Sequence, residues 1–311
     1  MQQLIKKVTM ITIPPYLKPG DSIGILCPSG YMPYEKALIA IETFTEWGFH
    51  IVPGKTLGSQ FNYFSGTDEE RLIDLQQMMD DDNIKAIFCA RGGYGMGRII
   101  DRINFKKFKK NPKWIIGFSD ITVLQSHLFS RYKIASLHAP MAAAFNDGEC
   151  NNQYIQSLHD ALTGQKAKYI ITGNEFNKKG KTSGILVGGN LSLLAHLVGT
   201  SSDIKTKDKI LFIEDVGEYI YNVDRMMYQL KRSGKLDELN GLIVGKFTEL
   251  KDTTTPFGQT TEEVIRSVVK EYDYPVCFDF PVSHTKENYA LKIGVGYKLS
   301  VSVNLVELKE L

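Results

Sequence analysis

Short apolar runs alternate with segments of helical periodicity through the first half of this 311-residue chain, and this alternation restricts the possible folds more than any other feature. Continuous apolar runs, which we expect to be strands, lie at 22–27, 50–52, 84–89, 114–118 and 134–137. Segments with apolar residues at helical spacing lie between or after them at 34–47, 68–79, 97–103 and 121–131. Parallel strands need such crossovers, and a sheet covered on both faces explains continuous apolar runs. The pattern therefore predicts an α/β fold whose N-terminal domain contains a parallel sheet.

A polar stretch separates this series from a second one. Residues 164–182 are rich in Gly, Asn and Lys, which is typical of turns and linkers. Beyond them we expect strands at 184–187, 209–213, 241–244 and 275–278, helices at 191–198, 221–233 and 260–271, and β-rich runs at 289–295 and 297–305. The predicted organisation is an N-terminal domain over residues 1–163, a linker over 164–182 and a smaller C-terminal β/α domain over 183–311.

Charge and cysteine usage exclude several classes of function. The formal net charge of +2 gives no strong field, so neither nucleic acid nor a membrane surface is an expected partner. The cysteines are Cys27, Cys89, Cys150 and Cys277. They include no C-x-x-C pair, which argues against a zinc site and a disulfide framework and favours a cytoplasmic protein. Lys6 and Lys7 precede an apolar stretch too broken for a secretory signal, and no run has the length of a membrane span.

A serine follows the fourth expected strand. The apolar run that starts at Trp114 ends at Gly117-Phe118, and Ser119 and Asp120 then begin a helical segment. A serine on such a strand-to-helix turn is exposed at the carboxyl edge of a sheet, as in the nucleophile elbow of serine hydrolases, although the second glycine of G-x-S-x-G is absent. The alternative is an ordinary helix N-terminus, in which Ser119 caps free N–H groups and Asp120 faces the positive end of the helix dipole.

The loop after the third expected strand is dominated by glycine and reads A-R-G-G-Y-G-M-G-R from Ala90 to Arg98. A Walker A loop needs Lys and then Ser or Thr after its second glycine, and a dinucleotide fingerprint needs glycine in place of Arg98. Nucleotide binding is therefore disfavoured. Two interpretations remain: amides of Gly92, Gly93 and Asp120 form an oxyanion hole, or the loop is a tight turn without a ligand.

Candidates for a base and an orienting acid come from the second half of the chain. A strand ends there in three carboxylates, Glu214, Asp215 and Glu218. Helix capping or ion pairing explains Asp215 and Glu218 better than it explains Glu214, and a divalent-metal site lacks repeated ligand spacing. His284 lies in a loop beyond a strand, where irregular backbone can direct an imidazole into a cleft.

Together, Ser119, His284 and Glu214 make a complete set of nucleophile, general base and orienting acid. The other histidines, His50, His127, His138, His159 and His196, lie within or directly beside helix and strand patterns. The sequence leaves open whether Glu214 or Glu218 orients the base.

Taken in order, these segments resemble the LD-carboxypeptidases, serine peptidases of the S66 family. The resemblance covers nearly the whole chain and is carried by the motifs at 20–24, 27–30, 90–95, 117–120, 188–191, 212–218, 224–226 and 281–284. It implies a Ser119–His284–Glu214 triad, with an oxyanion hole of backbone amides near Gly93 and Asp120. It also implies an N-terminal α/β domain, a smaller swivelling C-terminal β/α domain, a cytoplasmic homodimer and no metal or organic cofactor.

The resemblance further implies a substrate. LD-carboxypeptidases cleave the bond between the L-centre of diaminopimelate and a terminal D-alanine in murein tetrapeptides during cell-wall recycling, so a murein-derived peptide is expected. The same family includes microcin C self-immunity proteins, which cleave an amide between an amino acyl group and a nucleotide-like moiety. Their glycine loop usually departs from the R-G-G-Y-G form found at Arg91 to Gly95, which favours the murein substrate. An alternative of another class is a non-catalytic two-domain protein that binds a peptide or a carboxylate.

Overall fold

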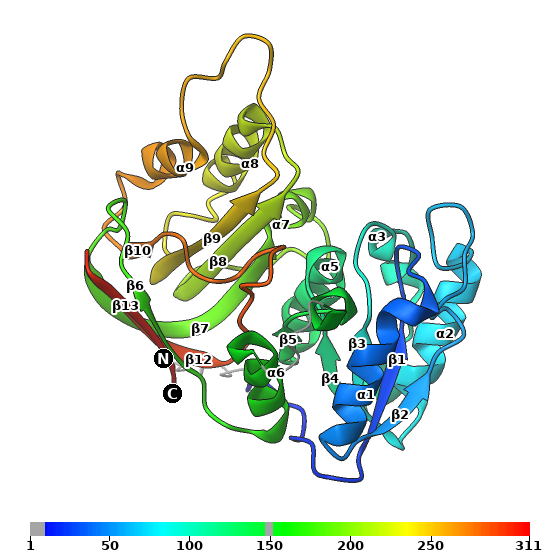
Figure 1. Ribbon diagram of the computed structural model, residues 1–311. Helices are drawn as coiled ribbons and strands as arrows, with labels where there is room; N and C mark the ends of the chain where they lie inside the picture. Colours follow the sequence, from blue (N-terminus) through cyan, green and yellow to red (C-terminus); the bar gives the residue numbers. More distant parts are fainter. Residues whose placement is uncertain (1–9, 147–151) are drawn as a thin grey trace, which may run out of the picture.

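The computed structural model describes residues 10–146 and 152–311, which form two sheets with helices packed against them (Figure 1). Cys150 and the pair Lys6 and Lys7 lie outside the described residues. The first sheet has the order β11-β5-β4-β3-β1-β2. Its strands are β1 (Ser22–Leu26), β2 (His50–Pro53), β3 (Ile84–Cys89), β4 (Trp114–Ile116), β5 (Ser136–His138) and β11 (Leu291–Ile293). The strands β1 to β5 pair in parallel, whereas β11 is antiparallel to β5.

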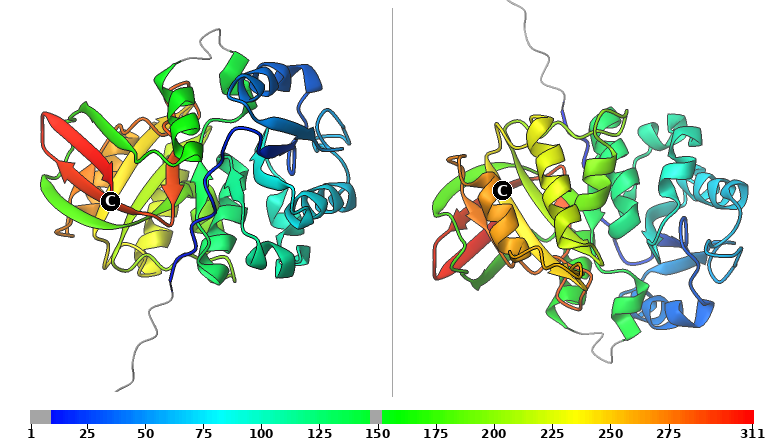
Figure 2. Two further views of the ribbon diagram at one scale, coloured as in Figure 1. Left: turned by 90° about the horizontal axis from the view of Figure 1, so that it is seen from below. Right: turned by 90° about the horizontal axis from the view of Figure 1, so that it is seen from above.

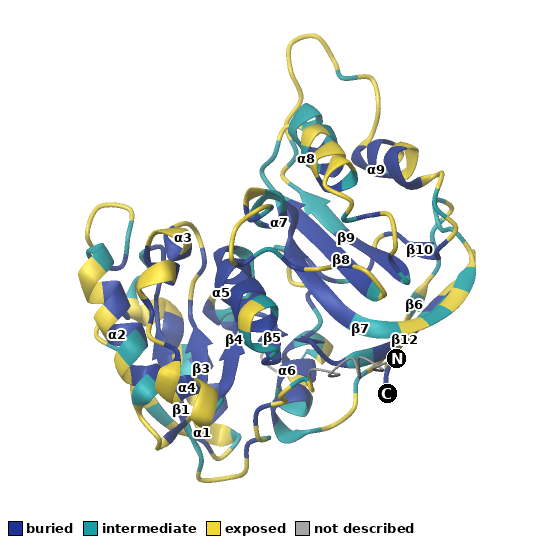
Figure 3. Cartoon of the chain, turned by 180° about the vertical axis from the view of Figure 1, so that it is seen from behind, coloured by how far each residue is buried: buried dark blue, intermediate teal, exposed yellow. Residues whose placement is uncertain are grey.

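Helices cover both faces of the first sheet. They are α1 (Leu38–Glu46), α2 (Asp68–Asp80), α3 (Met96–Ile99), α4 (Lys106–Lys110), α5 (Thr122–His127) and α6 (Gln153–Thr163), with short helical turns η1 (Tyr34–Ala37), η2 (Ile100–Arg102), η3 (Ser119–Ile121), η4 (Leu128–Tyr132) and η5 (Ala142–Asn146). The helices α1 and α6 share a core with one face, and α2 to α5 share a core with the other. Because both faces are covered, the central strands β3 and β4 are buried almost throughout (Figure 3).

The predicted parallel α/β domain is confirmed, and the five predicted strands and four helical segments of the first half are all present, with ends shifted by a few residues. Local sequence explains where α2 begins, because Thr67 and Glu70 form a capping box at its first turn. The sequence did not predict α6, which begins after the capping side chain of Asn152 and ends at Gly164, a residue with a left-handed φ of 91°.

The second sheet is mixed and has the order β10-β9-β8-β7-β12-β13-β6. Its strands are β6 (Lys168–Thr172), β7 (Gly180–Asn190), β8 (Lys209–Val216), β9 (Gly241–Thr248), β10 (Val276–Cys277), β12 (Gly296–Val301) and β13 (Leu305–Glu310), and the helices of this part are α7 (Leu191–His196), α8 (Ile220–Arg232) and α9 (Thr261–Val269). These three helices pack on one face of the sheet, as Figure 1 shows.

Part of the stretch 164–182, which the sequence predicts as a linker, belongs to this second sheet. It contains β6, which pairs with β13 at the edge of the sheet, and the first residues of β7. Within β6 only Tyr169 is buried. The strand itself reads K-Y-I-I-T, so the linker prediction came from the Gly, Asn and Lys residues that surround it and not from β6.

The part of the chain that forms the first sheet and the part that forms the second contact each other at more than one place. They lie as separate lobes in each view (Figure 2), yet β11, from near the C-terminus, completes the edge of the first sheet. One apolar cluster also runs from the first sheet into the second, including Phe88, Phe212 and Tyr297. Burial of this apolar surface stabilises the packing of the lobes. Within the described residues, no helix is both long and apolar enough to cross a membrane.

Candidate active site

Ser119 lies on a turn between β4 and α5, and its backbone has an unusual conformation. Its φ is 61°, in the left-handed region that non-glycine residues rarely adopt. Neither η3, which starts at Ser119, nor the following helix α5 has a side-chain hydrogen bond at its N-cap. The capping interpretation therefore does not explain this serine. Strain held at a partly exposed serine is typical of a functional turn.

The glycine loop lies directly against this turn. A Cβ atom added to Gly92 would be 2.9 Å from Ser119 Cβ and 3.2 Å from the Asp120 nitrogen. The Gly92 carbonyl accepts a hydrogen bond from the Gly30 amide at 2.9 Å, so the loop after β1 also contacts the glycine loop. The loops after β1, β3 and β4 therefore meet beyond the carboxyl ends of their strands, where open α/β sheets bind ligands. Only glycine leaves room for this contact.

The side chain of Asp120 holds these loops together. Its Oδ2 atom accepts hydrogen bonds from Ser29 Oγ at 2.6 Å and from the Met96 amide at 2.7 Å. Burial raises the pKa of Asp120, although both hydrogen bonds oppose the shift. The residue whose amide the sequence places in an oxyanion hole thus also links the loop after β1 and the glycine loop through its carboxylate.

Glu214 and His284 are brought together from distant parts of the second half of the chain. Glu214 lies near the carboxyl end of β8, His284 lies between β10 and β11, and the distance from His284 Nδ1 to Glu214 Oε2 is 2.7 Å. The Glu214 side chain is fully buried, and that of His284 is 16% exposed. Glu218 instead accepts a hydrogen bond from Asn222 at 2.9 Å. Of the two glutamates, Glu214 therefore contacts the imidazole.

The Glu214–His284 pair lies beside the serine turn. The His284 ring packs edge-on against Phe118, the residue before Ser119, with ring centroids 4.7 Å apart. His284 Nε2 is buried and makes no hydrogen bond with the described residues. Desolvation lowers the pKa of His284, but the charge and hydrogen bond of Glu214, aided by Asp215 and Glu249, outweigh it, so the net pKa is raised.

Ser119 and His284 line one cavity of about 680 Å³, a size suited to a small peptide. The glycine loop, the serine turn, the segment after β5 and the His284 segment contribute its walls. Its charged side chains are Arg91 and Lys286, and no Asp or Glu among the described residues lines it. Across those same residues, no group of three or more His, Cys, Asp and Glu side chains could hold a metal ion.

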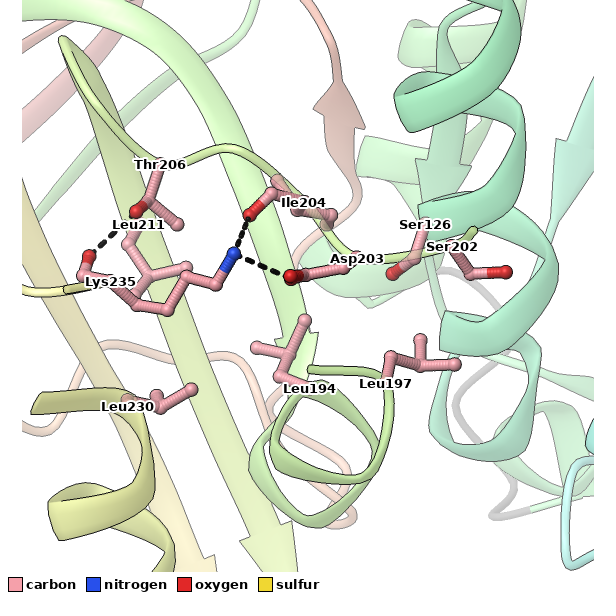
Figure 4. Close-up of a pocket in the computed structure, with 10 residues that line it drawn as sticks. All are labelled: Ser126, Leu194, Leu197, Ser202, Asp203, Ile204, Thr206, Leu211, Leu230 and Lys235. Atoms are coloured by element: carbon pink, nitrogen blue, oxygen red, sulfur yellow. Dashed lines mark hydrogen bonds and ion pairs between the residues drawn. The ribbon is translucent and has the colours of Figure 1, made fainter. Parts of the chain in front are cut away.

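A second, much smaller cavity lies away from these groups. It has about 20 Å³ and is closed in part by the ion pair between Lys235 and Asp203, at 2.6 Å (Figure 4). Ser126 from α5 faces it from the first lobe. A space of that size holds about one water molecule, and the candidate site is instead the cavity that Ser119 and His284 line.

Residues that connect the two lobes lie close to the serine turn. The Asn190 amide donates to Thr122 Oγ1 at 3.2 Å, and Asn190 Nδ2 donates to Asp215 Oδ1 at 2.8 Å. Burial, followed by the charge of Glu214, raises the pKa of Asp215 to about 7. Thr122 begins α5 directly after the serine turn, and Asp215 follows Glu214 in β8. Hydrogen bonds therefore connect the segment that carries Ser119 with the segment that carries Glu214.

Sequence reasoning missed the role of His138 in supporting this site. The side chain is fully buried at the end of β5, and Nε2 lies 3.2 Å from Asn288 Oδ1, which also accepts from the Ser283 amide at 3.3 Å. Burial lowers the pKa of His138 to about 4, so the imidazole is neutral. It thereby fixes the segment that carries His284. The available signal was its place at the carboxyl end of β5, which lies next to β4 in the sheet.

Comparisons with known proteins agree with this architecture over most of the chain. Residues 23–139 match the LD-carboxypeptidase N-terminal domain, and residues 183–299 match the LD-carboxypeptidase C-terminal domain. A "Probable murein peptide carboxypeptidase" of Bacillus subtilis is 34% identical over 90% of this chain and 89% of its own length. A "Murein tetrapeptide carboxypeptidase" of Pseudomonas aeruginosa is 28% identical over 78% of this chain and 80% of its own length.

Solved structures show the same fold. The crystal structure of muramoyltetrapeptide carboxypeptidase from Oxalobacter formigenes is 28% identical, covers 93% of this chain and 98% of its own, and has a TM-score of 0.84. The microcin C7 self immunity protein MccF shares the fold at 23% identity with a TM-score of 0.85, covering 96% of this chain and 99% of its own. From the matches to both domains and to relatives along nearly its whole length, the chain belongs to the LD-carboxypeptidase family, the S66 peptidases.

Proposed function

We propose that this protein is a serine carboxypeptidase that hydrolyses the L,D bond between diaminopimelate and the terminal D-alanine of murein tetrapeptides. The observation that carries the proposal is that His284, paired with Glu214, lines the same cavity as a strained Ser119. Relatives that are named as murein peptide carboxypeptidases supply the class of substrate. A cavity with cationic and no anionic lining among the described residues suits a peptide that carries several carboxylates.

In the proposed reaction, Ser119 Oγ attacks the carbonyl carbon of the scissile bond while His284 Nε2 takes the hydroxyl proton. The carbonyl oxygen becomes an oxyanion, and the amides near Gly93 and Asp120, together with Gly92, provide the hole that stabilises it. His284 then gives its proton to the nitrogen of the departing D-alanine, which leaves an acyl ester on Ser119. A water molecule, deprotonated by His284, attacks the ester, and the serine regains its proton as the shortened peptide leaves.

Glu214 has a supporting part in this scheme. Its carboxylate accepts from His284 Nδ1, which fixes the tautomer with Nε2 free to accept the serine proton. The negative charge also stabilises the imidazolium that forms in each half of the reaction. Buried Glu214 is well placed for this, because charge interactions are stronger away from water.

The test is release of D-alanine from a murein tetrapeptide by the purified protein. The wild type should release it, and Ser119→Ala should not. A processed microcin provides the comparison substrate for the other activity known in the family. Tight binding of the tetrapeptide without cleavage, and no labelling of Ser119 by a serine-directed probe, would support a binding protein and contradict the proposal.

Family resemblance also leads us to propose a cytoplasmic homodimer that acts in cell-wall recycling, without a metal or organic cofactor. Sedimentation of the purified protein tests the oligomeric state. Fractionation of the producing cells tests the location, and accumulation of tetrapeptides in cells lacking the protein tests the place in recycling.

A further inference from the structure

Arg91 differs from the other arginines near the proposed nucleophile in what its side chain contacts. It is exposed and lines the large cavity together with Ser119 and His284. Its guanidinium makes no hydrogen bond or ion pair with the residues that the structure describes. An arginine at the wall of a binding cavity, with its five donors not engaged by protein groups, is available to a ligand.

The other arginines around the glycine loop differ in this respect. Arg98 forms an ion pair with Asp68 at 2.7 Å and is not among the residues that line the cavity. Arg71 is buried, contacts the same aspartate, and donates to the Pro28 carbonyl at 2.8 Å. Asp68 therefore neutralises two of these cations but not Arg91. The unpaired positive charge of the loop faces the cavity.

The position of Arg91 relative to Ser119 defines what it could bind. The next residue, Gly92, touches the serine turn, and the Arg91 Nε atom lies 3.4 Å from where a Cβ of Gly30 would be. In a carboxypeptidase substrate, the free carboxylate is separated from the scissile carbonyl carbon by three covalent bonds, which span less than roughly 4 Å. The terminal carboxylate of a peptide attacked by Ser119 must therefore lie close to the glycine loop.

We propose that Arg91 binds the free carboxylate of the terminal residue and so makes the enzyme select peptides that end at the residue to be released. This inference rests on the proposed function. A guanidinium matches a carboxylate through two parallel N–H···O bonds, a geometry that the single ammonium of lysine does not provide. A site built around such a pair rejects a ligand that lacks the charge, because the donors then lose their acceptor.

The experiment compares a murein tetrapeptide that ends in D-alanine with the same peptide ending in D-alaninamide. The amide keeps the scissile bond and the leaving nitrogen but removes the negative charge. For the wild type, kcat/KM should be about 10- to 100-fold higher with the acid than with the amide, the range expected for loss of a charged hydrogen bond. Arg91→Gln should lower kcat/KM for the acid by a similar factor and leave the amide reaction nearly unchanged. With the acid, the kcat/KM of Arg91→Lys should lie between the values for the wild type and for Arg91→Gln.

Arg98→Gln is the matched control, because it removes the same charge from the same loop outside the cavity. It should retain the preference for the acid. Equal losses with both peptides in Arg91→Gln, or equal losses in Arg91→Gln and Arg98→Gln, would overturn the inference while leaving the proposed function intact. A wild type that cleaves neither peptide would instead contradict the proposed function, and the inference with it. Thermal unfolding of each variant checks that the exposed substitutions leave the fold unchanged.

Discussion

Glu214 and His284, 70 positions apart in the chain, meet through a 2.7 Å contact between a carboxylate oxygen and Nδ1 of the imidazole. The contact uses one ring nitrogen and leaves the other, Nε2, without a partner among the described residues. The ring also rests on Phe118 beside Ser119, so its orientation is fixed from two sides. An imidazole held in this way is suited to transfer protons between a serine and a leaving group.

Replacing Glu214 with Gln should lower kcat/KM by about a hundredfold to ten-thousandfold, because the amide keeps the size of the side chain but does not stabilise the imidazolium. Glu214 acts to raise the pKa of His284 above the ordinary 6.5, and the base must be neutral. In the wild type, kcat/KM should therefore rise with pH through an apparent pKa above 6.5, and in Glu214→Gln this limb should move to lower pH. Glu218→Gln is the control and should keep the wild-type profile. An unchanged profile in Glu214→Gln would contradict the assignment.

Ser119→Ala should abolish turnover and keep the strained turn, whereas Ser119→Gly should abolish turnover and relieve the strain. A left-handed conformation costs a non-glycine residue roughly 1–2 kcal/mol, and part of the gain from glycine is lost to the greater entropy of the unfolded chain. The glycine variant should therefore exceed the alanine variant in free energy of unfolding by up to about 1 kcal/mol. Urea denaturation of both proteins measures this difference. A less stable glycine variant would show that the turn is not strained.

Gly92→Ala should reduce kcat by about a hundredfold or more, because the new methyl group would press on Ser119 Cβ and on the Asp120 amide nitrogen. Gly97→Ala is the matched control from the same segment, where an added Cβ would meet nothing within 4 Å. The control should keep the wild-type kcat. Steady-state kinetics with the tetrapeptide compare the two, and similar kcat values in both variants would argue against an oxyanion hole at Gly92.

Gly189→Ala should lower kcat by disturbing the fit between the lobes, because a Cβ there would lie 2.6 Å from Thr122 side-chain atoms. Gly189 also has a φ of 146°, so the substitution strains the backbone as well. Gly199→Ala separates the two effects, since its φ is 84° but nothing lies within 4 Å of the added atom. If both variants lose the same fraction of activity, the contact with Thr122 does not align the site.

Much of the fold can be predicted from the sequence, because central parallel strands are buried on both faces and therefore consist of consecutive apolar residues. The exceptions have physical reasons. The edge strand β6 is short and lies in a stretch rich in Gly, Asn and Lys, and β11 is far in sequence from the sheet that it completes. The helix α6 had a readable signal, since Ile155, Leu158 and Leu162 recur at helical spacing and are buried.

The candidate site was predictable to the extent that it lies at strand ends. Ser119 and His284 each follow a strand, Glu214 lies near the carboxyl end of β8, and the structure brings the last two into contact. The choice between Glu214 and Glu218 was not predictable, because both lie at or just beyond the carboxyl end of β8 and only three-dimensional geometry shows which one reaches the imidazole. Arg91 was hidden for a different reason: its proposed role depends on its having no partner among residues 10–146 and 152–311, and partners are not visible in a sequence.

The antiparallel pairing of β11 with β5 has a consequence for how the protein is made. The outer edge of β5 stays unpaired until Leu291–Ile293 leaves the ribosome. His284 emerges just before this strand. A product of translation interrupted before His284 therefore lacks the proposed base and keeps the edge of β5 unpaired, which exposes it to proteolysis.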